Sequence, residues 1–338
     1  MYLPLVDNFW HAQATFMLTN RLPLYIGFVY IVVLYVPSAY IWQLRLSHWV
    51  IPITTALLGC LFYWPFDIIG AKFIWWTWHD SDNNTIPRIL GVPVASTMWM
   101  LTFQCCFSFL LNYCLNTSTH FQSSGSTRFQ QRGFTTGQLF RMFLTVCILS
   151  VPMMMLHMMT IQIMVSQTLP PLLHPPNTTM LCCTLLAYVA VCIYAAATNT
   201  LCVGGAQRFS IRCSRVLTVL VLAHFSFLTA MAIFGEPTQH LSIGVHQTYG
   251  PSDVVATDWS GLSRNVYISR ENMIHKDYFY ILGILDDGQD WYAIQGKEKS
   301  EDWVRGVLLA ICLASAGYIG FPVVTAVRNS FSQFKKNL

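Results

Sequence analysis

Seven runs of about twenty mostly apolar residues divide this chain, and they constrain its fold more than any other feature of the sequence. A helix needs about twenty residues to cross a hydrocarbon core about 30 Å thick. Lipid offers the backbone no hydrogen bonds, so each run is expected to be a helix. The sequence therefore predicts an all-α integral membrane protein, a bundle of seven transmembrane helices. The expected spans are 22–42, 48–69, 92–115, 139–166, 179–203, 216–234 and 304–327.

The composition agrees with this class. Hydrophobic residues make up 54% of the chain and charged residues 10%, and the mean hydropathy is +0.47, whereas about a quarter of the residues of soluble domains are charged. The net charge is only +4, and basic residues in such a chain serve to set its orientation, so nucleic acid is not expected as a partner. The first 20 residues lack the basic start and long apolar run of a cleaved signal peptide.

The distribution of charge predicts the orientation of the bundle. With the N-terminus outside, ten Arg and Lys of the short loops and the tail lie inside and only three lie outside, as the positive-inside rule requires. All 15 acidic residues then lie outside or at the outer end of a span. We therefore expect an N-out, C-in protein of the secretory pathway, in the plasma membrane or an endomembrane. The glycosylation sequons at 83–85 and 177–179 then lie outside and the one at 116–118 inside, so a glycoprotein is expected.

Three regions are expected along the chain. Residues 1–234 carry six spans and a polar hairpin at 67–93, residues 235–303 form an extracellular or lumenal loop, and residues 304–338 carry the seventh span and a basic cytoplasmic tail. Within the long loop, 278–285 and 291–294 read as two strands joined by a turn at 286–288, which predicts a β-hairpin. The stretch 236–250 reads as irregular and polar. The loop is expected to cap the outer mouth of the bundle.

The polar hairpin brings an acid into the second span. If the helix continues beyond residue 69, Asp67, Gly70, Ile74, Trp75 and Trp78 share one face. A carboxylate within a membrane is a functional candidate, so Asp67 is a candidate catalytic acid. The alternative is an acid at the helix end, near water or bonded to a polar neighbour. Trp75 and Trp78 are candidate ligand-binding residues, or members of an aromatic belt at the membrane surface.

The hairpin also contains an imidazole close to two carboxylates. His79, Asp80 and Asp82 lie within four residues, a set that suits a divalent metal or acid and base catalysis. His79 and Asp80 therefore join Asp67 as candidate catalytic residues, and His79, Asp80 and Asp82 are candidate metal ligands. A solvated acidic turn, with Asp80 or Asp82 paired to Arg88 or Lys72, is the alternative reading.

Further candidate ligand-binding residues are Arg88, Ser96, His240 and His246. Arg88 and Ser96 follow the acidic turn, and His240 and His246 lie in the long loop. The expected orientation places all four on the outer side, although spacing alone does not fix which of them converge.

Two strings carry a resemblance to a known family. WWTWHDSD, followed by Arg88, GVP and Ser96, and HLSIGVHQTYGP in the long loop resemble an uncharacterised family of seven-pass animal membrane proteins defined only as a domain of unknown function. Members of that family often have cysteines in the long loop, and this sequence has none there. The arrangement of Asp67, a glycine, WxW, GVP and Trp99 is also distantly similar to carotenoid-hydratase-like membrane proteins. That similarity implies addition of water to an isoprenoid double bond and carries over only Asp67.

Three functions remain open at this point. In the first, the outer face binds a lipophilic small molecule or a protein partner, in contact with membrane lipid. In the second, the chain is a membrane enzyme acting on a lipid or an isoprenoid double bond by acid–base or metal-assisted chemistry. In the third, it is a non-catalytic subunit of a membrane complex, and its polar residues hold the cap in place.

Overall fold

The computed structural model describes residues 9–44, 46–78, 87–120, 134–168, 176–198, 215–257, 263–269 and 278–336. The chain divides into two compact units. Unit 1 contains Met1–Val33, Tyr63–Thr97 and Val219–Ser315, and unit 2 contains Leu34–Phe62, Met98–Thr218 and Ala316–Leu338. Several helices begin in one unit and end in the other, so each unit is described by itself.

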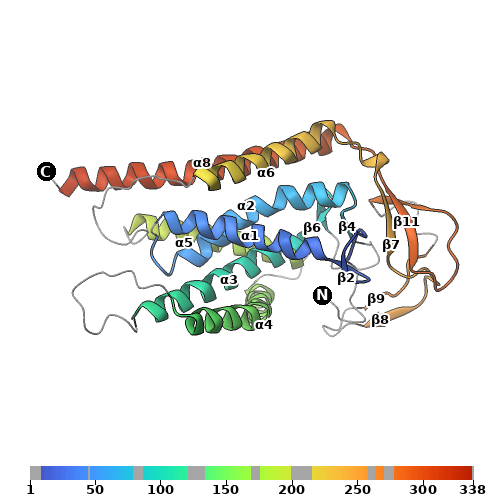
Figure 1. Cartoon of the computed structure of the whole chain (residues 1–338), viewed down its shortest axis with the longest axis horizontal. Helices are drawn as coiled ribbons and strands as arrows, with labels where there is room; N and C mark the ends of the chain where they lie inside the picture. The colour runs from blue at the N-terminus through green and yellow to red at the C-terminus, as the bar shows by residue number, and fades with distance from the viewer. Residues whose placement is uncertain are drawn as a thin grey trace. The chain divides into compact units, whose positions relative to one another are not determined.

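Seven helices in the described ranges are long and apolar enough to cross a membrane (Figure 1). The predicted number of spans and their positions along the chain are therefore confirmed. Most helix ends differ from the predicted ends by a few residues. The helices are α1 Leu24–Gln43, α2 Ile51–Lys72, α3 Val94–His120, α4 Thr136–Thr168, α5 Pro176–Ala197, α6 Arg215–Phe234 and α8 Glu301–Lys336.

The loop between α6 and α8 contains a three-stranded antiparallel sheet in the order β10-β11-β7. Strands β10 (Phe279–Leu282) and β11 (Trp291–Gly296) form the predicted hairpin, which is thereby confirmed. Strand β7 (Leu241–Val245) pairs with β11, with Ile243 opposite Ala293. The expectation that 236–250 is irregular is thus wrong, because β7 is specified by a partner strand about fifty residues away along the chain.

The remaining strands are short and lie in unit 1. They form two-stranded pairs, in which β1 pairs with β4, β2 with β3, β5 with β6 and β8 with β9. Their bounds are β1 Phe9–His11, β2 Met17–Thr19, β3 Leu22–Pro23, β4 Trp76–Trp78, β5 Arg88–Ile89, β6 Val92–Pro93, β8 Val255–Thr257 and β9 Ser263–Asn265. The β1–β4 pair joins the N-terminal segment to the chain that follows α2.

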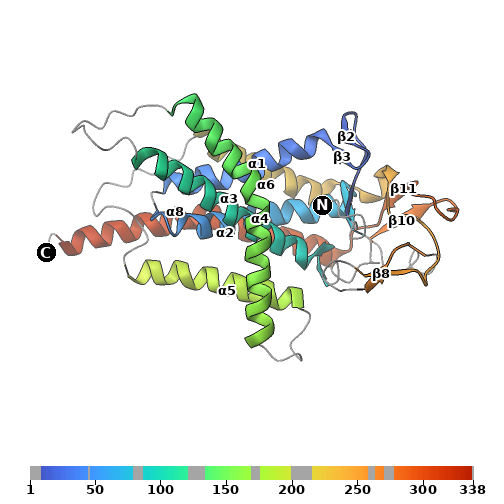
Figure 2. The ribbon, with the colours of Figure 1, turned by 90° about the horizontal axis from the view of Figure 1, so that it is seen from below.

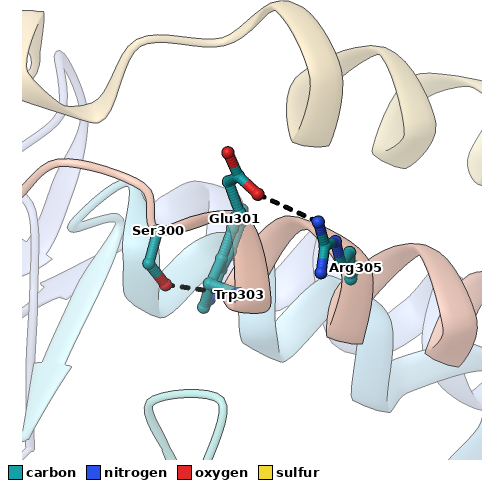
Figure 3. Close-up of polar contacts among 4 residues, drawn as sticks. All are labelled: Ser300, Glu301, Trp303 and Arg305. Carbon is teal, nitrogen blue, oxygen red and sulfur yellow. Dashed lines mark hydrogen bonds and ion pairs between the residues drawn. The ribbon is translucent and has the colours of Figure 1, made fainter.

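Helix α8 begins after a serine cap (Figure 3). The Ser300 hydroxyl accepts a hydrogen bond from the Trp303 backbone N–H at 3.1 Å, which satisfies one of the free donors of the first turn. Glu301 lies in that turn, where a negative charge suits the helix dipole, and its carboxylate pairs with Arg305 at 2.9 Å. This ion pair is largely exposed, so it contributes little to stability.

Buried tyrosines and polar side chains connect the helices of unit 2. The Tyr318 hydroxyl donates to the Leu58 carbonyl at 3.2 Å, and the Tyr40 hydroxyl donates to the Tyr318 carbonyl. Helix α4 crosses α5 (Figure 2), where the His157 Nε2 and Tyr188 hydroxyl lie 2.9 Å apart. These contacts join α1, α2 and α8 on one hand and α4 and α5 on the other.

Candidate functional site

The carboxylate of Asp67 lies in the last turns of α2 and is only 1% exposed. Its Oδ2 accepts a hydrogen bond from the Ser96 hydroxyl of α3 at 2.9 Å. Its Oδ1 accepts a longer one, of 3.3 Å, from the Tyr63 hydroxyl one turn earlier on α2. Both carboxylate oxygens are therefore engaged by hydroxyl donors, and the bond to Ser96 ties the end of α2 to the start of α3.

An indole ring covers the next turn of the helix. Trp76 lies against Gly70, where a Cβ atom would come within 2.6 Å of the indole Cε2 and closer still to Cζ2 and Cη2. Only glycine leaves room for the ring at this position. The indole N–H is buried and makes no hydrogen bond to any described residue. We call Tyr63, Asp67, Gly70, Trp76 and Ser96 the Asp67 centre.

The chain reaches this arrangement through a sharp reversal after α2. The Trp75 N–H bonds to the Gly70 carbonyl at 2.9 Å and the Ile74 N–H to the Ala71 carbonyl at 3.3 Å, the two bonds of a Schellman motif. The αL residue of this motif is usually glycine, but here it is Ile74, at φ 51°. The predicted continuation of the helical face to Trp78 is therefore wrong, since α2 ends at Lys72 and Trp76–Trp78 is strand β4.

Burial offsets the strain at Ile74. An αL conformation costs a residue other than glycine about 1–2 kcal/mol, whereas burying an isoleucine side chain gains about 1.5–3 kcal/mol. Ile74 is 2% exposed and belongs to a core that includes Tyr249, Phe279, Tyr292 and Ile294 of the loop. The turn that follows α2 is thereby anchored, through Ile74, in the core beneath the inner face of the three-stranded sheet.

Arg88 and the two candidate tryptophans hold further parts of unit 1 together. The Arg88 guanidinium donates to the Trp78 carbonyl at 3.0 Å and lies over the Tyr278 ring at 4.6 Å. Trp78 packs on Phe9, with ring centroids 4.9 Å apart. Trp75 accepts a hydrogen bond from Tyr25 at its carbonyl, and its own indole stacks on an aromatic ring of α6.

The two loop histidines pack on separate aromatic rings. His240 meets Phe73 edge to face, with centroids 5.0 Å apart, and His246 is buried beside Tyr292 at 4.9 Å. Across the part of the chain that the structure describes, no group of three or more His, Cys, Asp or Glu lies close enough together to hold a metal ion. The structure thus brings Asp67 and Ser96 together, while His240 and His246 lie among aromatic neighbours.

The predicted acidic cluster lies outside the described residues. His79, Asp80 and Asp82 all fall in the range 79–86, which separates β4 from β5. Their candidate catalytic and metal-binding roles remain predictions from the sequence.

The sequence did not predict that Tyr63, Gly70 and Trp76 belong to the Asp67 centre. Tyr63 could have been found, because it lies four residues before Asp67 on the same helix. Trp76 and the close approach to Gly70 could not, because they depend on a chain reversal at an isoleucine, which local sequence rules do not predict.

A second feature of unit 1 is an apolar sheet face that no other part of the described chain covers. Side chains alternate along the strands, so Phe279, Tyr292 and Ile294 enter the core and their neighbours point the other way. We call the outward-pointing set the exposed sheet face. Its large members, which are 38–55% exposed, are Leu241, Ile243, Tyr280, Leu282 and Trp291.

Strand register brings these side chains into adjacent rows. Leu282 and Ile243 both flank Ala293, while Tyr280 and Leu241 both flank Gln295. Lys297 lies at the rim, with its ammonium 5.0 Å from the centre of the Tyr280 ring. The face thus carries large apolar side chains on all three strands, with Gln295 between Tyr280 and Leu241 and with Trp291 at the start of β11. Apolar patches on folded proteins are often binding sites.

The family model described as a domain of unknown function, DUF7802, matches residues 1–318 of the chain. No curated protein and no solved structure matches the chain significantly.

Proposed function

The chain belongs to the DUF7802 family, whose description assigns no activity, and we propose that it binds a protein partner. In this proposal the chain is a multi-pass membrane protein, and the partner binds to the exposed sheet face. One observation carries the proposal. Five large apolar side chains lie on one face of a sheet whose opposite face is already filled by the protein's own core. Such a surface is stabilised when another molecule removes it from water.

The position of the sheet supports a partner in the aqueous phase rather than membrane lipid. Its inner face packs on Ile74, which lies two residues beyond the end of α2. The exposed sheet face therefore points away from that end of the span, and β7 and β11 lie beyond the end of α2 (Figure 1). In the N-out orientation expected from the charges, this surface faces the extracellular space or the lumen.

The shape of the surface supports a protein over a small lipophilic molecule. Small-molecule sites are concave and enclose most of their ligand, whereas one face of a three-stranded sheet is open. Protein interfaces bury roughly 800 Å² on each partner and concentrate their energy in a few residues, among which Trp and Tyr are enriched. Trp291 and Tyr280 are the aromatic members of this face.

The Asp67 centre supports a holding role in the same protein. Ser96 and Tyr63 engage both oxygens of the carboxylate, and Trp76 covers the adjoining turn of the helix. A base or acid that acts on a substrate must reach it within hydrogen-bonding distance. Asp67 is instead enclosed by residues that connect α2, α3 and β4, which favours the non-catalytic subunit over the enzyme.

Site-specific photo-crosslinking in cells tests the proposal. A photoreactive phenylalanine analogue is placed at Ile243 or Leu282 and, as a matched control, at Val255, which is 55% exposed on strand β8 of the same loop. We expect a discrete protein adduct from positions 243 and 282 and none from 255. A second substitution on the face, Leu241→Lys, should reduce the adduct without changing the amount of protein in the membrane.

The outcomes separate the possible occupants. An adduct of twice the chain's own mass identifies a second copy of the chain as the partner. An adduct of any other discrete mass identifies a different protein. Equal crosslinking at position 255, an adduct that Leu241→Lys leaves unchanged, or crosslinks to lipid alone would each overturn the proposal.

A further inference from the structure

Three buried polar side chains of unit 2 make no hydrogen bond to any described residue, and they lie on the facing helices α2 and α3. They are the Thr55 hydroxyl, both polar atoms of the Gln104 amide and the Ser108 hydroxyl. Thr55 and Gln104 are fully buried and Ser108 nearly so. Buried polar groups in proteins are almost always paired with protein or with ordered water, so these atoms indicate a ligand.

Neighbouring residues on the same helices show the usual alternative. Thr54 donates to the Val50 carbonyl at 3.0 Å, and Thr102 donates to the Met98 carbonyl at 2.9 Å. Each hydroxyl is thus satisfied by the backbone one turn earlier in its own helix. Thr55 and Ser108 could form the same bond but do not, so their hydroxyls remain available for another partner.

The packing of the two helices brings the three residues to one place. The Gln104 side chain lies over Gly59, where a Cβ atom would be 2.8 Å from Gln104 Cγ. Further along, Asn112 of α3 donates to the carbonyl of His48, which precedes α2, at 2.9 Å. The helices are therefore antiparallel, so the turn from Gly59 to Thr55 runs alongside the turn from Gln104 to Ser108.

The site lies deep along the helix. Gln104 is ten residues beyond the first residue of α3, which corresponds to about 15 Å of helix, half of a hydrocarbon core about 30 Å thick. At this depth neither bulk water nor lipid headgroups reach a side chain that is enclosed by protein.

The chemistry of these atoms specifies the ligand. Gln104 Oε1 accepts hydrogen bonds and Nε2 donates them, and neither meets a partner within the described ranges. A cation would leave the donor unsatisfied, and an anion would leave the acceptor unsatisfied. Water satisfies both, and a buried water typically makes about three hydrogen bonds. We propose that α2 and α3 bind water between Thr55, Gln104 and Ser108, close to the middle of the membrane.

A crystal structure of the full chain, grown in a lipidic cubic phase and refined at a resolution that reveals ordered water, tests the inference directly. We expect a solvent peak within hydrogen-bonding distance of the Gln104 amide and of at least one of the Thr55 and Ser108 hydroxyls. An amide bonded directly to protein groups, with no solvent peak beside it, would overturn the proposal.

Nuclear magnetic resonance provides a second and independent measurement on the intact protein. With ¹⁵N-labelled glutamine, the side-chain amide of Gln104 should show magnetisation transfer from water, and its signal is assigned by its loss in Gln104→Met. Methionine has a similar volume and no hydrogen-bonding amide, so the variant is expected to fold. Absence of transfer from water at the Gln104 signal would contradict bound water in this site.

Discussion

Replacing Gly70 by alanine tests the packing of the Asp67 centre with the smallest possible change. A Cβ atom at this position would come within 2.6 Å of Trp76 Cε2 and closer to two further indole carbons. The ring cannot move away easily, because Trp76 is 3% exposed, packs on Phe66 at a centroid distance of 5.3 Å, and belongs to a strand paired with β1. The substitution should therefore displace the indole and disturb the environment of Asp67.

The size of the effect follows from two opposing terms. Overpacking a filled core costs about 1–3 kcal/mol, while glycine to alanine within a helix gains about 1 kcal/mol. Gly27 of α1, also in unit 1, provides the control, since no atom of the described chain lies within 4 Å of the position that its Cβ would occupy. Gly27→Ala should gain the helix term alone, so the free energies of unfolding of the two variants should differ by about 1–3 kcal/mol.

Thermal unfolding of the purified protein in detergent, followed by tryptophan fluorescence, measures this difference. At about 2–4 °C per kcal/mol, Gly70→Ala should unfold roughly 2–12 °C below Gly27→Ala, and its initial emission spectrum should change because an indole has moved. Equal unfolding temperatures with unchanged emission would show that Trp76 does not lie against Gly70.

Four further outcomes are expected. Ser96→Ala should lower the free energy of unfolding by about 1–3 kcal/mol, because a buried hydrogen-bond acceptor of Asp67 loses its donor; an unfolding temperature equal to that of the wild type would argue against the 2.9 Å bond. At Ile74, glycine should be tolerated better than alanine, the reverse of the usual order, because both lose the buried side chain and only glycine relieves the αL strain at φ 51°; circular dichroism melts of the two variants decide this. Burial lowers the pKa of His11 from 6.5 to about 4, so the unfolded chain binds this proton more readily, stability falls as the pH drops from about 6.5 to about 4, and His11→Gln should weaken that dependence in melts recorded across this range. A glycosylation tag added after Leu338 should remain unmodified in cells, as assayed by glycosidase digestion, and its modification would refute the expected cytoplasmic C-terminus.

The sequence predicted an element correctly wherever the residues of that one segment were enough to specify it. The spans could be predicted because apolar length is a property of each segment alone, and the β10–β11 hairpin because its turn residues at 286–288 separate two apolar strands. Strand β7 was missed because its partner β11 is about fifty residues away, and β4 was missed because WWTW suits a helix face equally well. The end of α2 was misplaced because Ile74 occupies a position that glycine usually takes.

The same distinction applies to the candidate site, where the sequence identified single residues but not the contacts between them. The sequence identified Asp67 as a carboxylate in a span, since acids are rare in such segments, and Ser96 only as a separate candidate for ligand binding. It did not indicate that Ser96 and Tyr63 engage opposite oxygens of Asp67, or that His240 and His246 pack on different rings. Those relations depend on how distant segments pack, and several packings are compatible with the same local pattern.

The sequence by itself determined that the chain is a seven-span membrane protein, because the bilayer imposes one requirement of length and polarity on each segment separately. Only the tertiary structure decided which sheet face is filled by the protein's own core and which remains exposed, because strand pairing and the insertion of Ile74 assign each alternating side chain to one face or the other. The proposed partner surface therefore follows from packing, while the number and positions of the spans follow from composition along the chain.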